Sequence, residues 1–77
     1  MSQLSESIKE SSALASMQRM LEKYAEKKKI SFDEAMKQYG ESESYVALFD
    51  YDTELWKEGP DYLLEWFEEE ISKISNL

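Results

Sequence analysis

The chain has 77 residues, with no cysteine and no histidine, and its 17 acidic and nine basic side chains give a net charge of −8. A chain of this length forms one small domain, whose core alone supplies only about 3–5 kcal/mol of stability. The missing residue types exclude disulfides and the thiolate and imidazole ligands of zinc. We therefore expect no metal and no cofactor, and oligomerisation or a bound partner remains as the means of added stability.

The negative charge is concentrated in the C-terminal half. Residues 38–77 carry eleven acidic side chains and only Lys57 and Lys73, whereas residues 1–37 carry six acidic and seven basic ones. Such a surface repels phosphate backbones and anionic membranes, and no apolar run approaches the roughly 20 residues that span a bilayer. We expect a basic protein partner, no membrane association and, from the absence of cysteine and of a signal peptide, a cytoplasmic location.

A serine-rich stretch opens the chain, and we expect residues 1–12 to be a flexible segment ahead of a single helical domain over residues 13–77. The first helix is predicted to begin at Ser11 or Ser12 and to end at the lysine run 27–29, which complements the helix dipole. Its apolar face has helical spacing. The residues on that face are Leu14, Met17, Leu21 and Tyr24, with Ala13 and Met20 beside them.

A capping box predicts the start of a second, short helix, because Ser31 is followed three residues later by Glu34. Gly40 is expected to end this helix in a left-handed conformation. A third short helix over residues 45–49, capped by Ser42 or Ser44, follows. The second helix should pack through Phe32, Ala35, Met36 and Tyr39.

Asp50 to Thr53 is predicted to form a turn, after which Leu55 and Trp56 cover the core. Pro60 then begins the last helix, because proline suits the first helical position. Its apolar stripe, formed by Leu63, Phe67, Ile71 and Ile74, is widened by Tyr62, Leu64 and Trp66.

These patterns predict an all-α fold, a small bundle of three to four helices, two long and two short. The predicted core consists of Leu14, Met17, Leu21, Phe32, Met36, Leu48, Phe49, Leu63, Phe67 and Ile71.

The sequence contains two weak signals for ligand binding, one for DNA and one for calcium. The second and third helices have the outline of a helix-turn-helix, but residues 41–50, which would enter the major groove, have no lysine or arginine. Asp50, Asp52 and Glu54 alternate like the first ligands of a calcium loop, but Leu55 occupies the position that needs glycine. We interpret this stretch as a solvated acidic turn.

No residues for catalysis are evident. Without histidine, a serine nucleophile lacks its usual activating base, and two glycines cannot build a phosphate-binding loop. We predict that the protein is not an enzyme and assign no catalytic, cofactor-binding or metal-binding residue.

Aromatic side chains in the acidic half indicate a non-catalytic protein–protein interaction module, because aromatic residues anchor interfaces. The candidate partner-binding residues are Tyr51, Trp56, Tyr62 and Trp66. The alternative is a small nucleic-acid-binding regulator that uses the basic segment 19–37. Its candidate contacts are Arg19, Lys23, Lys27, Lys28, Lys29 and Lys37.

The last helix has an apolar arc wider than one neighbouring helix covers, so we also expect a homodimer through Trp66. The alternative is that Leu4 and Ile8 fold back over that arc. Like charges oppose the homodimer unless they lie at its wet rim; the residues are Glu65, Glu68, Glu69 and Glu70.

The order of features resembles a family of short uncharacterised bacterial proteins, a domain of unknown function sometimes encoded beside a toxin-like partner. The resemblance covers about two thirds of the chain and implies an all-helical fold and an interaction role, with no catalytic residues. The residues that carry it are Glu22 to Glu26, Ile30 to Ala35, Tyr39-Gly40, the link from Tyr51-Asp52 to Gly59, and Tyr62-Leu63 leading to Glu70-Ile71.

Overall fold

A computed structural model describes the backbone of residues 2–75 and the side chains of residues 7–74. This part of the chain contains four α-helices, two long and two short, joined partly by 3₁₀ helices and without any strand, which confirms the predicted fold class. In chain order the elements are α1 (Ser2–Lys28), α2 (Phe32–Gly40), α3 (Glu43–Phe49), η1 (Tyr51–Thr53), η2 (Leu55–Lys57) and α4 (Pro60–Ser75).

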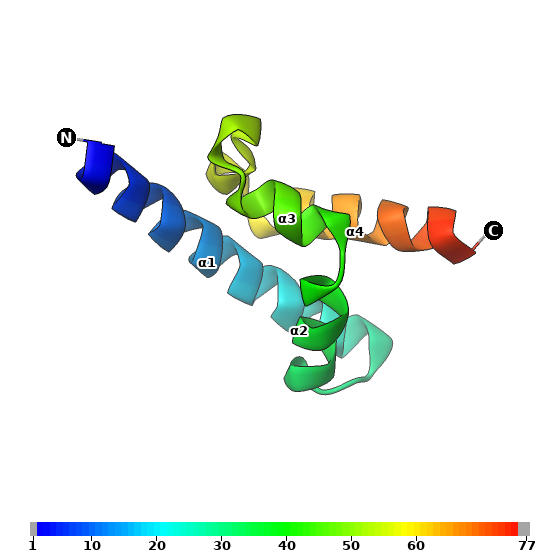
Figure 1. The fold of residues 1–77 in the computed structure, drawn as a ribbon. Helices are drawn as coiled ribbons and strands as arrows, with labels where there is room; N and C mark the ends of the chain where they lie inside the picture. Colours follow the sequence, from blue (N-terminus) through cyan, green and yellow to red (C-terminus); the bar gives the residue numbers. More distant parts are fainter. Residues whose placement is uncertain (1, 76–77) are drawn as a thin grey trace.

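Helix α1 is the element on which the others are assembled. It packs against α2, α4 and η2, while α3 packs against α4 and η2. Figure 1 shows α1 crossing the molecule from the N-terminus, with α2 near its C-terminal end and α3 on its other side. None of the described helices combines the length and the apolar character that crossing a membrane requires.

Helix α1 begins earlier than predicted and ends in a left-handed C-cap. Helical structure begins at Ser2, earlier than the start predicted at Ser11 or Ser12; the expected flexibility of residues 1–12 stays a prediction. At the other end Lys29 has φ 58°. The N–H of Ile30 donates to the carbonyl of Ala25 at 3.0 Å, and that of Lys29 to Glu26 at 3.3 Å, the hydrogen bonds of a left-handed helix C-cap.

The serine caps of the two short helices are confirmed. The N–H of Glu34 donates to Oγ of Ser31 at 3.0 Å, and Ser42 rather than Ser44 caps α3. The prediction for Gly40 was wrong: it is the last residue of α2, and no glycine has a positive φ. Because the chain passes directly into the Ser42 cap, α2 ends at Glu41 in a right-handed conformation and needs no left-handed residue.

Aromatic rings form a continuous row through the core and join all four α-helices. Phe67 of α4 lies with its ring centroid 4.9 Å from that of Tyr24 and 5.0 Å from that of Tyr39. Tyr39 in turn meets Tyr45 edge to face at 5.8 Å, and Tyr45 meets Phe49. Phe67 is 2% exposed, so the row is centred where the sequence predicted the core.

The buried tyrosines keep their hydroxyl groups paired. The hydroxyl of Tyr24 donates to Oε1 of Gln38 at 2.8 Å, and that of Tyr39 to the carbonyl of Ser44 at 3.4 Å. Burial, with a smaller contribution from the charge of Glu68, raises the pKa of Tyr24. Burial, followed by the nearby charge of Glu70, also raises the pKa of Tyr39. Both side chains therefore belong to the core as neutral phenols.

Two residues of the predicted core are exposed, each for a different reason. Leu14 is 43% exposed, because the buried stripe of α1 runs through Ala13 and Met17. Leu14 follows Ala13 directly and therefore lies about 100° around the helix from it. Phe32 is 40% exposed, because α2 packs mainly through Ala35 and Tyr39 and Phe32 lies at its first turn. The other predicted core residues are buried or pack against the core.

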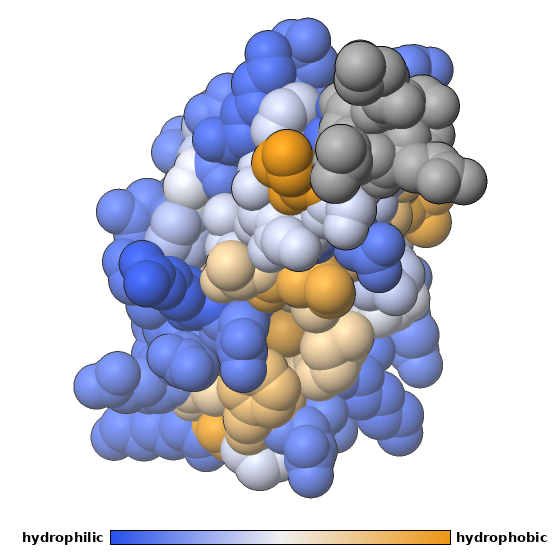
Figure 2. Space-filling view, turned by 90° about the vertical axis from the view of Figure 1, so that its left-hand side faces the viewer, coloured by the Kyte–Doolittle hydropathy of each residue, from blue (hydrophilic) through white to orange (hydrophobic). Residues whose placement is uncertain are grey.

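Apolar surface remains outside the core as well. Val46 and Ile74 are 68% and 61% exposed; Ile74 therefore leaves the packed part of the α4 stripe. Figure 2 shows one face on which apolar side chains gather in a band framed by hydrophilic ones. A domain this small cannot bury all of its apolar residues.

Candidate functional site

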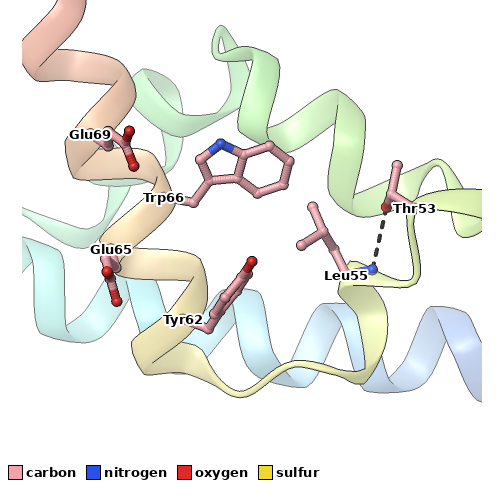
Figure 3. A pocket seen from close by; sticks show the side chains of 6 residues that line it. All are labelled: Thr53, Leu55, Tyr62, Glu65, Trp66 and Glu69. Carbon is pink, nitrogen blue, oxygen red and sulfur yellow. Dashed lines mark hydrogen bonds between the residues drawn. The ribbon is translucent and has the colours of Figure 1, made fainter.

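A hollow of about 350 Å³ opens between α4 and the two 3₁₀ helices. Figure 3 shows Tyr62 and Trp66 reaching from α4 toward Leu55, with Thr53 opposite and two glutamates on the α4 side. The lining residues are Thr53, Leu55, Tyr62, Glu65, Trp66 and Glu69. The volume lies at the small end of the range of ligand sites, about 300–1,000 Å³.

The 3₁₀ helices fix the wall opposite α4. Leu55 is 6% exposed and belongs to the core. Oγ1 of Thr53 donates to the carbonyl of Ala47 at 2.7 Å and accepts from the N–H of Leu55 at 3.3 Å. Glu54, between Thr53 and Leu55, has φ 61°, and this left-handed residue separates η1 from η2. The hydrogen bond from Thr53 to Ala47 therefore holds this wall to α3.

Tyr62 and Trp66 form the aromatic side of the hollow. They lie four residues apart, on one face of α4, and are 52% and 39% exposed. Leu63 and Phe67, one position further along, are 1% and 2% exposed. One face of α4 thus builds the core, while the adjoining face presents two large aromatic rings to solvent.

Carboxylates border these rings. Glu65 and Glu69 line the same hollow, and Glu69 lies 3.5 Å from the ammonium of Lys73. A second hollow, of about 130 Å³, shares Trp66 and Glu69 with the first. The two hollows together form a groove along α4 that extends to Lys73. The second hollow is lined by Glu43, Ser44, Trp66, Glu69, Glu70 and Lys73.

Glu70 joins α4 to α3 at this second hollow. Its carboxylate accepts hydrogen bonds from the N–H groups of Glu43 and Ser44, each at 2.9 Å, and from the Ser44 hydroxyl at 2.6 Å. Burial by itself raises the pKa of Glu70, but these hydrogen bonds outweigh burial and lower that pKa below its ordinary value. Glu70 is therefore an ionised structural cap and is occupied within the fold.

The structure brings together two of the four predicted partner-binding residues. Tyr62 and Trp66 line the hollow, whereas Tyr51 and Trp56 are not among its lining residues. Trp56 is half-buried, and the ammonium groups of Lys9 and Lys57 lie 5.6 and 5.8 Å from the centre of its ring. Its buried Nε1–H has no acceptor among the described residues. Trp56, a residue of η2, is thus in contact with α1 through Lys9.

The acidic turn shows no geometry for a cation. Asp50 caps η1, accepting from the N–H of Asp52 at 3.2 Å. In the part of the chain with described side chains, no group of three or more acidic residues is placed to hold a metal ion. The arrangement is that of a capped turn.

Four lining residues were missing from the sequence-based candidates. Glu65 and Glu69 share the four-residue spacing of Tyr62 and Trp66, so the helical pattern alone contained that signal. Thr53 and Leu55 approach α4 only because η1 and η2 fold back over it, which no local pattern predicts.

Comparison with family models, with curated proteins and with solved structures gives no match. The resemblance to short bacterial proteins therefore stays a prediction.

Proposed function

We propose that the protein is a non-catalytic interaction module that binds a basic protein through the groove along α4. The observation that carries this proposal is the exposure of Tyr62 and Trp66 beside the carboxylates of Glu65 and Glu69. Aromatic side chains that become fully buried on binding supply much of the energy of many interfaces. The surrounding negative charge steers a cationic partner and rejects an anionic one.

The alternative, nucleic-acid binding through the segment 19–37, is less well supported. The ammonium of Lys27 lies 2.7 Å from the carboxylate of Glu68, and Lys23 pairs with Asp61. Two of its six candidate cations therefore already face acidic side chains of α4. The N–H groups of Glu43 and Ser44 at the start of α3 are likewise occupied by Glu70, so they do not attract phosphate.

A salt titration separates these two functions. Duplex DNA and a cationic peptide of alternating leucine and arginine are each mixed with the protein at low ionic strength. The proposal predicts that the peptide binds, more weakly as salt rises, and that the DNA shows no gel shift. A DNA shift with a steep salt dependence, together with no peptide binding, would contradict it. A cytoplasmic location stays a separate prediction from composition.

Self-association is the second candidate use of the same face. Ile8 is 62% exposed and lines neither hollow, and the side chain of Leu4 lies outside the described residues. Trp66 therefore remains available to a second copy. In a two-fold contact Glu65 and Glu69 would approach their own copies, so salt should strengthen a homodimer while it weakens a basic partner.

Sedimentation over a range of salt tests self-association. A homodimer should appear at tens of micromolar, an order of magnitude typical of interfaces of standard affinity, and should be lost in a folded Trp66→Glu variant. A monomer at every salt concentration would remove this candidate. A Trp66→Glu variant that fails to fold would place Trp66 in the core instead.

A further inference from the structure

The two tryptophans differ in what lies over their rings. Trp56 has the ammonium groups of Lys9 and Lys57 within 6 Å of its ring centre, at 5.6 and 5.8 Å. Trp66 is 39% exposed, and within residues 7–74 no cation lies over its ring. The ring of one tryptophan is therefore already in contact with cations of the fold, while the ring of the other is not.

The surroundings of Trp66 favour a positive charge. Glu65 and Glu69 line the same hollow, and Lys73 is the cation that approaches it along α4. Lys73 meets Glu69 at 3.5 Å with both side chains largely exposed, at 77% and 61%. Such an exposed pair contributes little and is readily exchanged for a better one. The hollow thus has two aromatic rings, two carboxylates and no firmly bound cation.

We propose that this hollow receives an arginine side chain of the partner protein. Its guanidinium stacks on the ring of Trp66 and donates hydrogen bonds to Glu65 or Glu69, while its aliphatic stem lies against Tyr62 and Leu55. This inference rests on the proposed function and names the side chain that is recognised. Charge complementarity carries it, because an anionic or neutral side chain would leave both carboxylates facing an apolar contact.

Arginine fits this hollow better than lysine for two physical reasons. Its planar guanidinium is weakly hydrated and stacks on aromatic faces. The same group presents several N–H donors that can reach a carboxylate in the bidentate manner while the stacked contact is kept. Lysine offers a compact, strongly hydrated charge and satisfies only one of these contacts at a time.

Nuclear magnetic resonance with three matched peptides tests the proposal. The peptides alternate leucine with arginine, with lysine or with citrulline, which has the shape of arginine without its charge. The arginine peptide should shift the indole N–H signal of Trp66 with a Kd on the order of 1 mM, and should leave the signal of Trp56 unmoved. The citrulline peptide should bind at least about tenfold more weakly, and lysine should rank between them. A Trp56→Phe variant assigns the two signals.

Variants of the rim complete the test. Glu65→Gln and Glu69→Gln should each weaken binding of the arginine peptide about threefold or more, whereas Glu22→Gln, an exposed change on α1, should not alter it beyond the general effect of one charge. Equal affinity for the arginine and citrulline peptides would overturn the arginine proposal. Binding of the arginine peptide without a shift of the Trp66 signal would also overturn the arginine proposal, although the basic-partner function would then stand. No binding of either cationic peptide would overturn both.

Discussion

Glu70, on α4, accepts a hydrogen bond of 2.6 Å from the hydroxyl of Ser44 and one of 2.9 Å from its backbone N–H. Ser44 lies in the first turn of α3 and is 3% exposed. A residue 26 positions away in the sequence therefore satisfies the free donors at the start of a helix of only seven residues. Since so short a helix is unstable alone, its position against α4 depends on this carboxylate and on the aromatic row beneath it.

Removing this carboxylate should destabilise the fold. Glu70→Ala leaves the buried hydroxyl and N–H of Ser44 without an acceptor, which costs about 1–3 kcal/mol. Urea denaturation followed by circular dichroism measures the change. Glu69→Ala, one residue away and largely exposed, is the matched control and should stay within about 0.5 kcal/mol of the parent. Equal effects of the two variants would contradict the capping role.

Stability should fall in acid partly through the same group. The pKa of Glu70 is lowered in the folded state, so its contribution is fully present above the ordinary glutamate pKa of 4.5. That contribution is lost as the pH falls toward and through the lower folded-state pKa, because the unfolded state binds the proton more readily than the folded state. Urea midpoints of the parent and of Glu70→Gln, compared at neutral and acidic pH, should converge as the pH falls. A constant difference would contradict the prediction.

The centre of the aromatic row should be the most sensitive point of the core. Phe67→Ala removes the ring that contacts both Tyr24 and Tyr39, and truncating a buried phenylalanine costs about 3–5 kcal/mol, as much as a core of this size supplies. Thermal melting by circular dichroism should show loss of the cooperative transition. Phe67→Leu, which keeps most of the volume, should melt cooperatively at a lower temperature. A Phe67→Ala variant that melts within a few degrees of the parent would place the core elsewhere.

The left-handed residue after α1 predicts a stabilising substitution. Lys29 has φ 58°, which costs a non-glycine residue about 1 kcal/mol. Lys29→Gly should therefore raise the free energy of unfolding by some tenths of a kcal/mol to about 1 kcal/mol. Lys28→Gly, within the last turn of the helix, should lower it. A destabilised Lys29→Gly variant would show that the lysine side chain contributes more than the backbone strain costs.

The fold class, the serine caps and the proline start were predictable because each depends on residues within four positions of one another. Ser31 with Glu34 and Pro60 with its apolar stripe are local signals. Leu14 was misplaced because the neighbouring helices decide which side of α1 is buried, and Leu14 lies about 100° around the helix from Ala13. Phe32 lies on the packed face of α2 but in its first turn, where the core does not cover it. The link between Glu70 and Ser44 spans α3 and α4, so no local pattern contains it.

The candidate site was predictable to the same extent. Tyr62 and Trp66 line one hollow because they lie four residues apart on one face of α4, a spacing visible in the sequence; their role in binding stays a prediction. Trp56 was placed with them on composition, but the fold covers its ring with Lys9 and Lys57. The difference between an open and a covered tryptophan depends on which elements meet, which the aromatic content of a segment does not reveal.

The most direct test of the central claim separates the groove from the net charge. The double variants Glu65→Arg/Glu69→Arg and Glu22→Arg/Glu26→Arg change the charge equally, the first beside Trp66 and the second on the exposed side of α1. Affinity for the arginine peptide is measured for both at the same ionic strength. We predict that the groove variant loses at least about tenfold, equivalent to 1.4 kcal/mol, and the α1 variant less than about threefold. Equal losses would contradict the account, because the whole acidic surface rather than the groove along α4 would then attract the partner.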